Sequence, residues 1–144
     1  MAHVVELPGE SNPLTPQNVL NALVLAASST QQQVHTGTQQ LQNWEKQENY
    51  YTSLQDVFLD HSVPNEVRYL AIIQLKNGID KYWRKTATNA IKKEEKEQIK
   101  NRALQAGVVE PAALLALHNA LMIAKIMRYE FPQDCCSSNY FVKA

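Results

Sequence analysis

Helical periodicity of the apolar residues is the feature that most constrains the fold of this chain. A series of apolar residues from Val19 to Ala27 is spaced one, three, one and three positions apart, which places it on one face of an α-helix. Thr15 before Pro16 marks the start of that helix, because Thr caps N–H groups and Pro is tolerated at the first helical position. No stretch alternates apolar and polar residues as a half-buried strand does. The periodicity therefore predicts an all-α fold.

Six helices in three successive pairs account for the pattern. The first helices of the pairs start near residues 16, 50 and 94, and Trp44 and Trp83 lie 39 positions apart, each at the end of a second helix. A helical hairpin that repeats about every 40 residues is typical of HEAT and armadillo arrays. The sequence thus predicts an α-α superhelix (a HEAT/armadillo-like solenoid) of about three antiparallel helical hairpins, with a four-helix bundle as the alternative. The expected helices cover residues 16–27, 31–47, 50–60, 64–82, 94–106 and 111–130.

Two of these helices have an unusual composition. Residues 31–47 are rich in Gln and carry a thin apolar stripe, so we expect a polar outer or groove-facing helix, with a disordered Gln tract as the alternative. Gly37 weakens the middle of this helix by about 1 kcal/mol. Residues 111–130 are apolar almost all round, which is typical of a helix packed between neighbours. Glu97 and Lys100, in the charged helix before it, are spaced for an ion pair.

The sequence contains no recognisable catalytic, cofactor or metal-binding motif. There is no phosphate-binding loop and no nucleophile elbow, and the four histidines lack metal-ligand spacing. The only two cysteines, Cys135 and Cys136, are adjacent, which excludes a disulfide framework. No apolar run reaches about 18 residues, and the first residues lack the features of a secretory signal. We therefore expect a protein that is no enzyme, needs no cofactor and binds no membrane.

Charge is unevenly distributed although the formal net charge of the chain is zero. Residues 1–60 carry a net charge of −5 and residues 61–144 carry +5, an asymmetry that indicates charged partners. Residues 81–102 combine eight basic with three acidic side chains, and Asp80 directly precedes them, so we expect a mixed, solvated face; a phosphate-binding track for nucleic acid is the alternative. The basic residues are Lys81, Arg84, Lys85, Lys92, Lys93, Lys96, Lys100 and Arg102.

A more specific pattern lies in the middle of the chain. A Leu-x-x-Trp motif occurs at Leu41 and Trp44, and an aromatic-rich helix follows over residues 51–58. The next helix reads Val-Arg-x-x-Ala-x-x-x-Leu-Lys-Asn-x-Ile over residues 67–79. With these motifs, the chain resembles the importin N-terminal domain, the opening HEAT repeats of the importin-β (karyopherin-β) family. It is most similar to the importin eleven branch, through Tyr82-Trp83-Arg84 and Glu94-Glu95-Lys96, and the resemblance covers roughly residues 16–134.

This resemblance implies a nuclear transport receptor. Members of the family bind protein cargo, contact Phe-Gly nucleoporins in the pore and release cargo when Ran-GTP binds, shuttling between nucleus and cytoplasm. Their N-terminal repeats bind Ran-GTP through the second helices of the hairpins, which are residues 31–47, 64–82 and 111–130 here. The resemblance thus implies Ran-GTP as the partner of this chain. Cargo and Phe-Gly nucleoporins would bind through repeats that the chain lacks.

Candidate residues for these roles follow from the same resemblance. We expect Glu45, Glu48 and Lys76 to contact Ran, a small GTPase that a broad charged surface can hold and steer. We expect Arg68 and Asn77 to link one hairpin to the next through hydrogen bonds to helix ends. The set with an expected structural role is Leu41, Trp44, Arg68, Leu75, Asn77 and Trp83.

The chain departs from the family pattern in two places. Gln39 and Gln40 stand where the family often has acidic residues before the Leu-x-x-Trp motif. After Asp134 the family continues with Trp-Pro and further repeats, whereas this chain reads Cys135-Cys136, so we expect a truncated receptor. The predicted organisation is a flexible leader (1–14), N-terminal HEAT-like repeats (15–134) with the importin N-terminal domain at about 36–110, and a divergent tail (135–144).

Three functional hypotheses follow, in order of support. The first is the Ran-GTPase-binding region of an importin-β-type receptor in nucleocytoplasmic protein import. The second is a generic HEAT-repeat scaffold whose binding ignores the nucleotide state of Ran. The third is a nucleic-acid binder that uses residues 81–102, although the acidic residues there argue against it.

Overall fold

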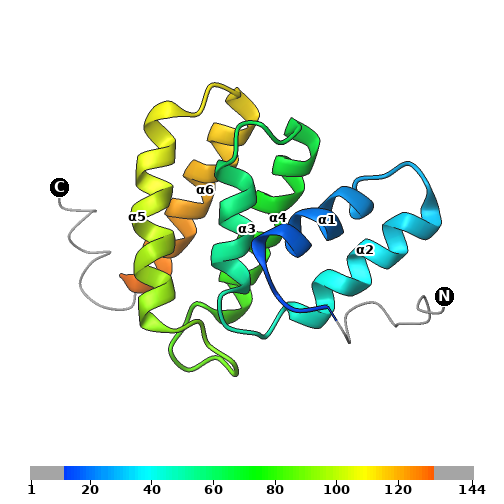
Figure 1. Ribbon diagram of the computed structural model, residues 1–144. Helices are drawn as coiled ribbons and strands as arrows, with labels where there is room; N and C mark the ends of the chain where they lie inside the picture. Colours follow the sequence, from blue (N-terminus) through cyan, green and yellow to red (C-terminus); the bar gives the residue numbers. More distant parts are fainter. Residues whose placement is uncertain (1–11, 132–144) are drawn as a thin grey trace. The chain divides into compact units, whose positions relative to one another are not determined.

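The computed structural model describes residues 12–131, and within them the chain forms six α-helices and no strand (Figure 1). The helices follow one another as three pairs, which confirms the all-α class with helical hairpins that the periodicity predicts. Most of the expected leader and the whole expected tail fall on residues 1–11 and 132–144, outside the described residues. The helices are α1 (Pro16–Ala26), α2 (Gln31–Trp44), α3 (Tyr50–Leu59), α4 (Asn65–Tyr82), α5 (Lys93–Val109) and α6 (Ala113–Glu130).

Two compact units make up the chain, and the boundary between them falls inside α4, between Leu75 and Lys76. The first unit contains α1, α2, α3 and the first part of α4. The second unit contains the rest of α4 together with α5 and α6. Each unit is described below by itself.

In the first unit, α1 begins at the cap that the sequence predicts. The side-chain hydroxyl of Thr15 accepts a hydrogen bond from the backbone N–H of Asn18 at 3.1 Å, and Pro16 is the first helical residue. α1 packs against both α2 and α3. Val19 and Leu23 are fully buried as a result, and each such side chain stabilises the fold by roughly 2 kcal/mol.

Gly37 lies at the contact between α2 and α1. A Cβ atom at this position would lie 2.5 Å from the carbonyl oxygen of Ala22 and 2.6 Å from the backbone nitrogen of Ala26. No side chain fits into that space, so only glycine allows the two helix backbones to approach this closely. The sequence pattern treats Gly37 as a weak point of its helix, whereas the structure shows that helix packing requires it.

Arg68 joins the two helices of the second pair. It is almost fully buried, and its Nε donates a hydrogen bond to the backbone carbonyl oxygen of Phe58 at 2.8 Å. Its Nη1 donates to Oδ1 of Asn65 at 3.2 Å, and the guanidinium lies 5.4 Å from the centre of the Phe58 ring. The carbonyl of Phe58 lies in the last turn of α3, where carbonyls lack partners within the helix. Through these contacts Arg68 connects α4 to α3 of its own pair; the link from one hairpin to the next that the sequence predicts for it stays a prediction.

In the second unit, α5 and α6 pack against each other. Ile99 and Ala103 of α5 and Met122 of α6 are fully buried. Asn119 of α6 is also buried, and its Nδ2 donates a hydrogen bond to the carbonyl oxygen of Ala103 at 2.9 Å. This polar contact inside an apolar core fixes how the two helices align.

The end of α5 differs from the sequence prediction. The helix continues through Ala106 and Gly107 to Val109, and the N–H of Glu110 still donates to the carbonyl oxygen of Ala106 at 3.0 Å. A glycine ends a helix when it adopts a left-handed conformation there, and Gly107 instead stays helical. The Glu97–Lys100 ion pair of this helix is confirmed, at 3.1 Å.

Three other helix boundaries also differ from those that the sequence predicts. α2 ends at Trp44 rather than at residue 47, because a turn follows in which Asn49 adopts a φ of 71°. α4 begins directly after Pro64, whose carbonyl oxygen accepts the N–H of Arg68 at 3.1 Å. α6 begins two residues after Pro111. Both prolines therefore precede their helices rather than occupy the first helical position.

α6 is buried on one side only within the described residues. Leu115, Met122 and Ile126 are buried, whereas the opposite side exposes a row of leucines by 43–54% of their surface. Within residues 12–131 the helix contacts α5 and, through polar side chains, α4, but one side stays exposed, so the expectation that it is packed between neighbours holds only in part. Among these residues, none of the helices combines the length and the apolar character needed to cross a membrane. The exposed leucines are Leu114, Leu117 and Leu121.

We expect the substitution Gly37→Ala to lower the free energy of unfolding by about 1–3 kcal/mol, because the added methyl group meets the backbone of α1. Urea titration followed by circular dichroism measures this change. Gly107→Ala is the matched control, since its methyl group has room, with Nδ2 of Asn119 nearest at 3.6 Å. The control should keep or raise stability, by up to roughly 1 kcal/mol. Equal midpoints for Gly37→Ala and the wild type would contradict the required close approach.

Candidate protein-interaction surface

The candidate site is a protein-interaction surface on the second helices of the pairs. Within residues 12–131, no group of three or more His, Cys, Asp or Glu side chains is placed to hold a metal ion. The second helices of the pairs, α2, α4 and α6, are where the sequence predicts contacts with a protein partner. The polar side chains on these helices therefore define the candidate site.

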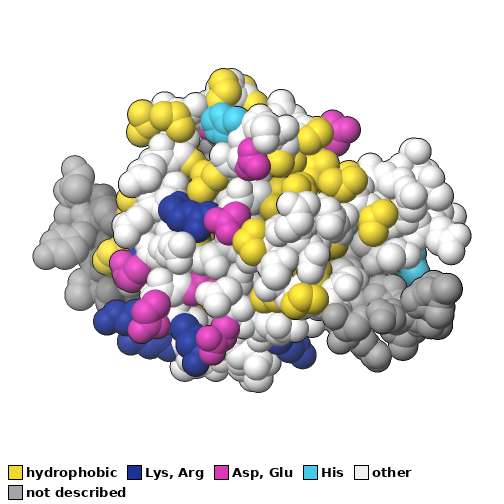
Figure 2. All heavy atoms as spheres, in the orientation of Figure 1, with side chains coloured by type: hydrophobic (Ala, Val, Ile, Leu, Met, Phe, Trp, Pro, Cys, Tyr) yellow, Lys and Arg dark blue, Asp and Glu magenta, His cyan; other side chains and the backbone are white. Residues whose placement is uncertain are grey.

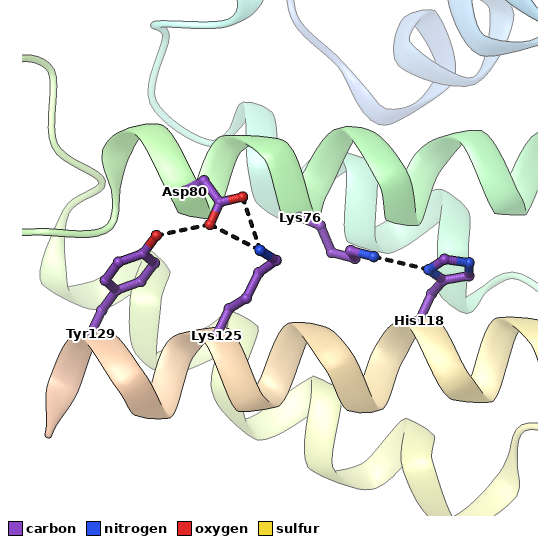
Figure 3. Close-up of polar contacts among 5 residues, drawn as sticks. All are labelled: Lys76, Asp80, His118, Lys125 and Tyr129. Atoms are coloured by element: carbon purple, nitrogen blue, oxygen red, sulfur yellow. Dashed lines mark hydrogen bonds and ion pairs between the residues drawn. The ribbon is translucent and has the colours of Figure 1, made fainter. Parts of the chain in front are cut away.

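In the second unit, polar side chains of α4 and α6 face one another in a row, which we call the α4–α6 polar row (Figure 3). Nζ of Lys76 lies 2.9 Å from Nδ1 of His118. One turn further along α4, both carboxylate oxygens of Asp80 accept hydrogen bonds from Nζ of Lys125, at 3.0 and 3.1 Å. The hydroxyl of Tyr129 donates to the same carboxylate at 2.8 Å.

The Lys76–His118 contact fixes the protonation of the ring. An ammonium group carries only donors, so Nδ1 of His118 accepts the hydrogen bond and the neutral ring carries its proton on Nε2. Burial and the charge of Lys76 lower the pKa of His118. Burial and the nearby Lys125 lower the pKa of Lys76, with Asp80 acting in the opposite direction. Protonation of His118 would place a second positive charge beside Lys76, so the contact is favourable while His118 is neutral.

Asp80 is held in its charged form. Burial acts to raise the pKa of Asp80, but the hydrogen bonds from Tyr129 and Lys125 outweigh it and hold the pKa below the ordinary value. The hydrogen bond to Asp80, together with burial, raises the pKa of Tyr129. The row therefore presents a carboxylate held between the hydroxyl of Tyr129 and the ammonium of Lys125, with the ammonium of Lys76 next along the row (Figure 3), and a charged protein partner can bind such a pattern.

Helical spacing explains which residues share the row. Lys76 and Asp80 are four positions apart on α4, and His118, Lys125 and Tyr129 are seven and four positions apart on α6, so each set lies on one helix face. Lys76 is predicted from the sequence as a site residue, whereas Asp80, Lys125 and Tyr129 are not. The spacing shows that they share a face, but not which helix lies opposite.

Glu45 and Glu48 lie in the first unit, in the turn after α2, and so apart in the chain from Lys76 of the second unit. The backbone carbonyl of Glu45 accepts a hydrogen bond from the hydroxyl of Tyr51 at 2.9 Å, and Glu48 is exposed. Burial, with a smaller contribution from the charge of Glu45, raises the pKa of Tyr50. This turn therefore carries the two acidic residues, and the buried rings of Tyr50 and Tyr51 follow it directly in the chain.

The expected structural residues fall into two groups. The indole N–H of Trp44 donates to the carbonyl oxygen of Asn12 at 3.3 Å, and that of Trp83 donates to Oε2 of Glu130 at 3.2 Å. Asn77 is instead exposed on α4, and its side-chain amide makes no hydrogen bond within residues 12–131, so its expected linking role stays a prediction. The buried members of the set are Leu41, Trp44, Arg68, Leu75 and Trp83.

Comparison with known proteins places these observations in a family. The importin-β N-terminal domain family matches residues 37–108 of the chain. Importin beta-like protein KAP120 of Saccharomyces cerevisiae is 40% identical over 123 residues, which is 81% of this chain and 12% of that protein. Importin-11 of Homo sapiens is 35% identical over 120 residues, again 81% of this chain and 12% of the relative.

A third relative, importin beta-like protein kap113 of Schizosaccharomyces pombe, is 36% identical over 94 residues, covering 65% of this chain and 10% of that protein. The chain therefore spans about an eighth or less of the length of these relatives. No solved structure matches the chain significantly.

Mild acid should destabilise the chain through His118. Its folded-state pKa lies below the unfolded value, so the unfolded chain binds the proton first, and stability falls as the pH drops below about 6.5. The decrease in urea midpoint between neutral and mildly acidic pH should therefore be smaller in His118→Gln than in the wild type. His35→Gln, at an exposed position of α2, is the control and should keep the wild-type decrease. The same decrease in all three proteins would rule out His118 as the source.

Proposed function

Because the chain belongs to the importin-β family, we propose that it is the Ran-GTP-binding N-terminal region of a nuclear transport receptor that acts in protein import. The match to the importin-β N-terminal domain over residues 37–108 is the observation that carries this proposal. That stretch includes the whole second pair, α3 and α4, together with most of α2 and α5.

The surface chemistry supports a protein partner. Lys76 and the carboxylate of Asp80 lie on the second helix of a pair, and both are held by hydrogen bonds from or to α6. Prepositioned charges of both signs steer a charged protein and fix its register without a catalytic group. Lys76, Glu45 and Glu48 are the residues that we propose to contact Ran. The exposed amide of Asn77, next to Lys76, adds a hydrogen-bonding group to the same helix.

Cargo and Phe-Gly nucleoporins belong to the wider proposal. The relatives are about eight times longer than the matched part of this chain, and most of a cargo-binding surface would lie in that additional length. We propose that a receptor with this region shuttles between nucleus and cytoplasm. A HEAT-repeat scaffold whose binding ignores the nucleotide state of Ran is the alternative.

Binding of the purified chain to Ran, loaded either with a non-hydrolysable GTP analogue or with GDP, tests the proposal. We expect binding to the GTP form to be at least about tenfold tighter, which corresponds to about 1.4 kcal/mol. Lys76→Ala, and separately the double change Glu45→Ala with Glu48→Ala, should each weaken that binding by about tenfold.

Lys46→Ala is the matched control for these variants, because Lys46 is an exposed charge in the same turn as the two glutamates. It should leave the affinity unchanged. Equal affinity for both nucleotide forms would favour the scaffold alternative. No binding by a chain with a native circular dichroism spectrum would refute the proposal for this chain.

A further inference from the structure

A second surface feature of the second unit adjoins the α4–α6 polar row at Tyr129. Two adjoining hollows of about 480 and 460 Å³ open at the first turns of α5, beside the loop that precedes it. They share Lys85, Lys96 and Glu130, and we call them together the basic pocket. Figure 2 shows Lys and Arg side chains gathered over this end of α5, with acidic side chains between them.

The basic pocket has more positive than negative charge available to a ligand. Arg84, Lys85, Lys93 and Lys96 line it, and within residues 12–131 none of these four forms an ion pair. The only acidic residues in its lining are Glu97 and Glu130, and each forms an ion pair with Lys100 at 3.1 Å.

Aromatic rings hold two of the cations in place. Nζ of Lys96 lies 5.4 Å from the centre of the Trp83 ring, and the guanidinium carbon of Arg84 lies 5.0 Å from the centre of the Tyr129 ring. These cation–π contacts orient the charges. The Trp83 ring is buried and Arg84 lies over the Tyr129 ring, so neither ring offers a free face for a nucleobase to stack on, and the pocket is poorly suited to single-stranded nucleic acid.

Crowding of positive charge adds to the attraction for an anion. Burial lowers the pKa of Lys96; Glu130 acts in the opposite direction, and the neighbouring Lys85 and Lys100 lower the pKa further. The pocket also lies at the N-terminal end of α5, where the helix dipole is positive. A bound carboxylate would relieve the repulsion among these lysines.

An apolar groove of about 350 Å³ continues from the basic pocket, with Glu130 and Phe131 in both linings. It lies between α5 and α6. Three of its side chains expose more than half of their surface: Leu104 by 60%, Met127 by 54% and Phe131 by 59%. A ligand that follows the surface out of the basic pocket therefore meets an apolar side-chain site next.

We propose that the basic pocket and the apolar groove together form a docking site for an acidic peptide segment of a partner protein. Its Asp or Glu side chains bind Arg84, Lys85, Lys93 and Lys96, and an adjacent aromatic or aliphatic side chain enters the groove between Leu104 and Phe131. Charge complementarity favours the acidic residues of the peptide, and burial of apolar surface favours its adjacent aromatic or aliphatic side chain. This site is independent of the Ran contacts proposed above, since none of its residues belongs to them.

Isothermal titration calorimetry of the full 144-residue chain with a synthetic peptide tests the site. The probe has a run of Asp and Glu followed by Phe-Leu, and its matched controls replace either the acids by Asn and Gln or Phe-Leu by Ser-Ser. We expect each control peptide to bind about tenfold more weakly or more, and binding of the probe to weaken as salt increases.

Variants of the chain assign the binding to the site. Lys85→Gln should weaken binding of the probe about tenfold. It should not affect the fold, because Lys85 makes no hydrogen bond or ion pair within residues 12–131. Phe131→Ser should weaken binding of the probe but leave binding of the Ser-Ser control peptide unchanged. Lys46→Gln and Leu114→Ser, an exposed lysine and an exposed leucine outside the site, are controls that should bind like the wild type.

Three results would overturn the proposal. One is equal binding of the probe and the peptide without acids, and another is no binding by the folded chain. The third is that the chain binds a single-stranded oligonucleotide more tightly than the probe, and that Lys85→Gln abolishes this oligonucleotide binding. That result would assign the pocket to nucleic acid.

Discussion

The carboxylate of Glu130 is the contact on which the second unit depends most. One of its oxygens accepts the indole N–H of Trp83, just after α4, and the other binds the ammonium of Lys100 on α5, so a single group on α6 joins three elements. Leaving a buried indole N–H without a partner would cost about 1–3 kcal/mol. Lys100 is the lysine that pairs with this carboxylate, so the cations that line the basic pocket keep their charge available to a ligand. A contact that stabilises the fold thereby also determines the charge of the surface.

Helical periodicity predicts the existence and order of all six helices, since burial of one face per helix is a local property of the sequence. It fails where a residue's effect depends on another helix. From the sequence alone, Gly37 is predicted to weaken its helix, and only the position of α1 shows why glycine is needed there. Gly107 is predicted to end its helix, although α5 continues through it. The missing information in both cases is tertiary packing, which overrides local propensity.

The same limit applies to the candidate site. Spacing predicts that Lys76 and Asp80 share a face, but hydrogen bonding across helices depends on which face of α6 lies opposite. The motif around Arg68 is visible in the sequence, yet its partner, a carbonyl at the end of α3, is a backbone group that side-chain patterns do not reveal. Membership of the importin-β family, in contrast, is accessible from the sequence because it rests on motifs over a continuous stretch.

The placement of the two tryptophans has a practical consequence. The chain contains only two, and the structure puts Trp44 in the core of the first unit and Trp83 in that of the second, each about 1% exposed. Indole fluorescence responds to contact with water, so each unit carries its own intrinsic reporter. Single-tryptophan versions made by Trp44→Phe or Trp83→Phe would follow the two cores separately. Coincident transitions would mean that α4, which is continuous across the boundary, makes the whole chain one cooperative unit.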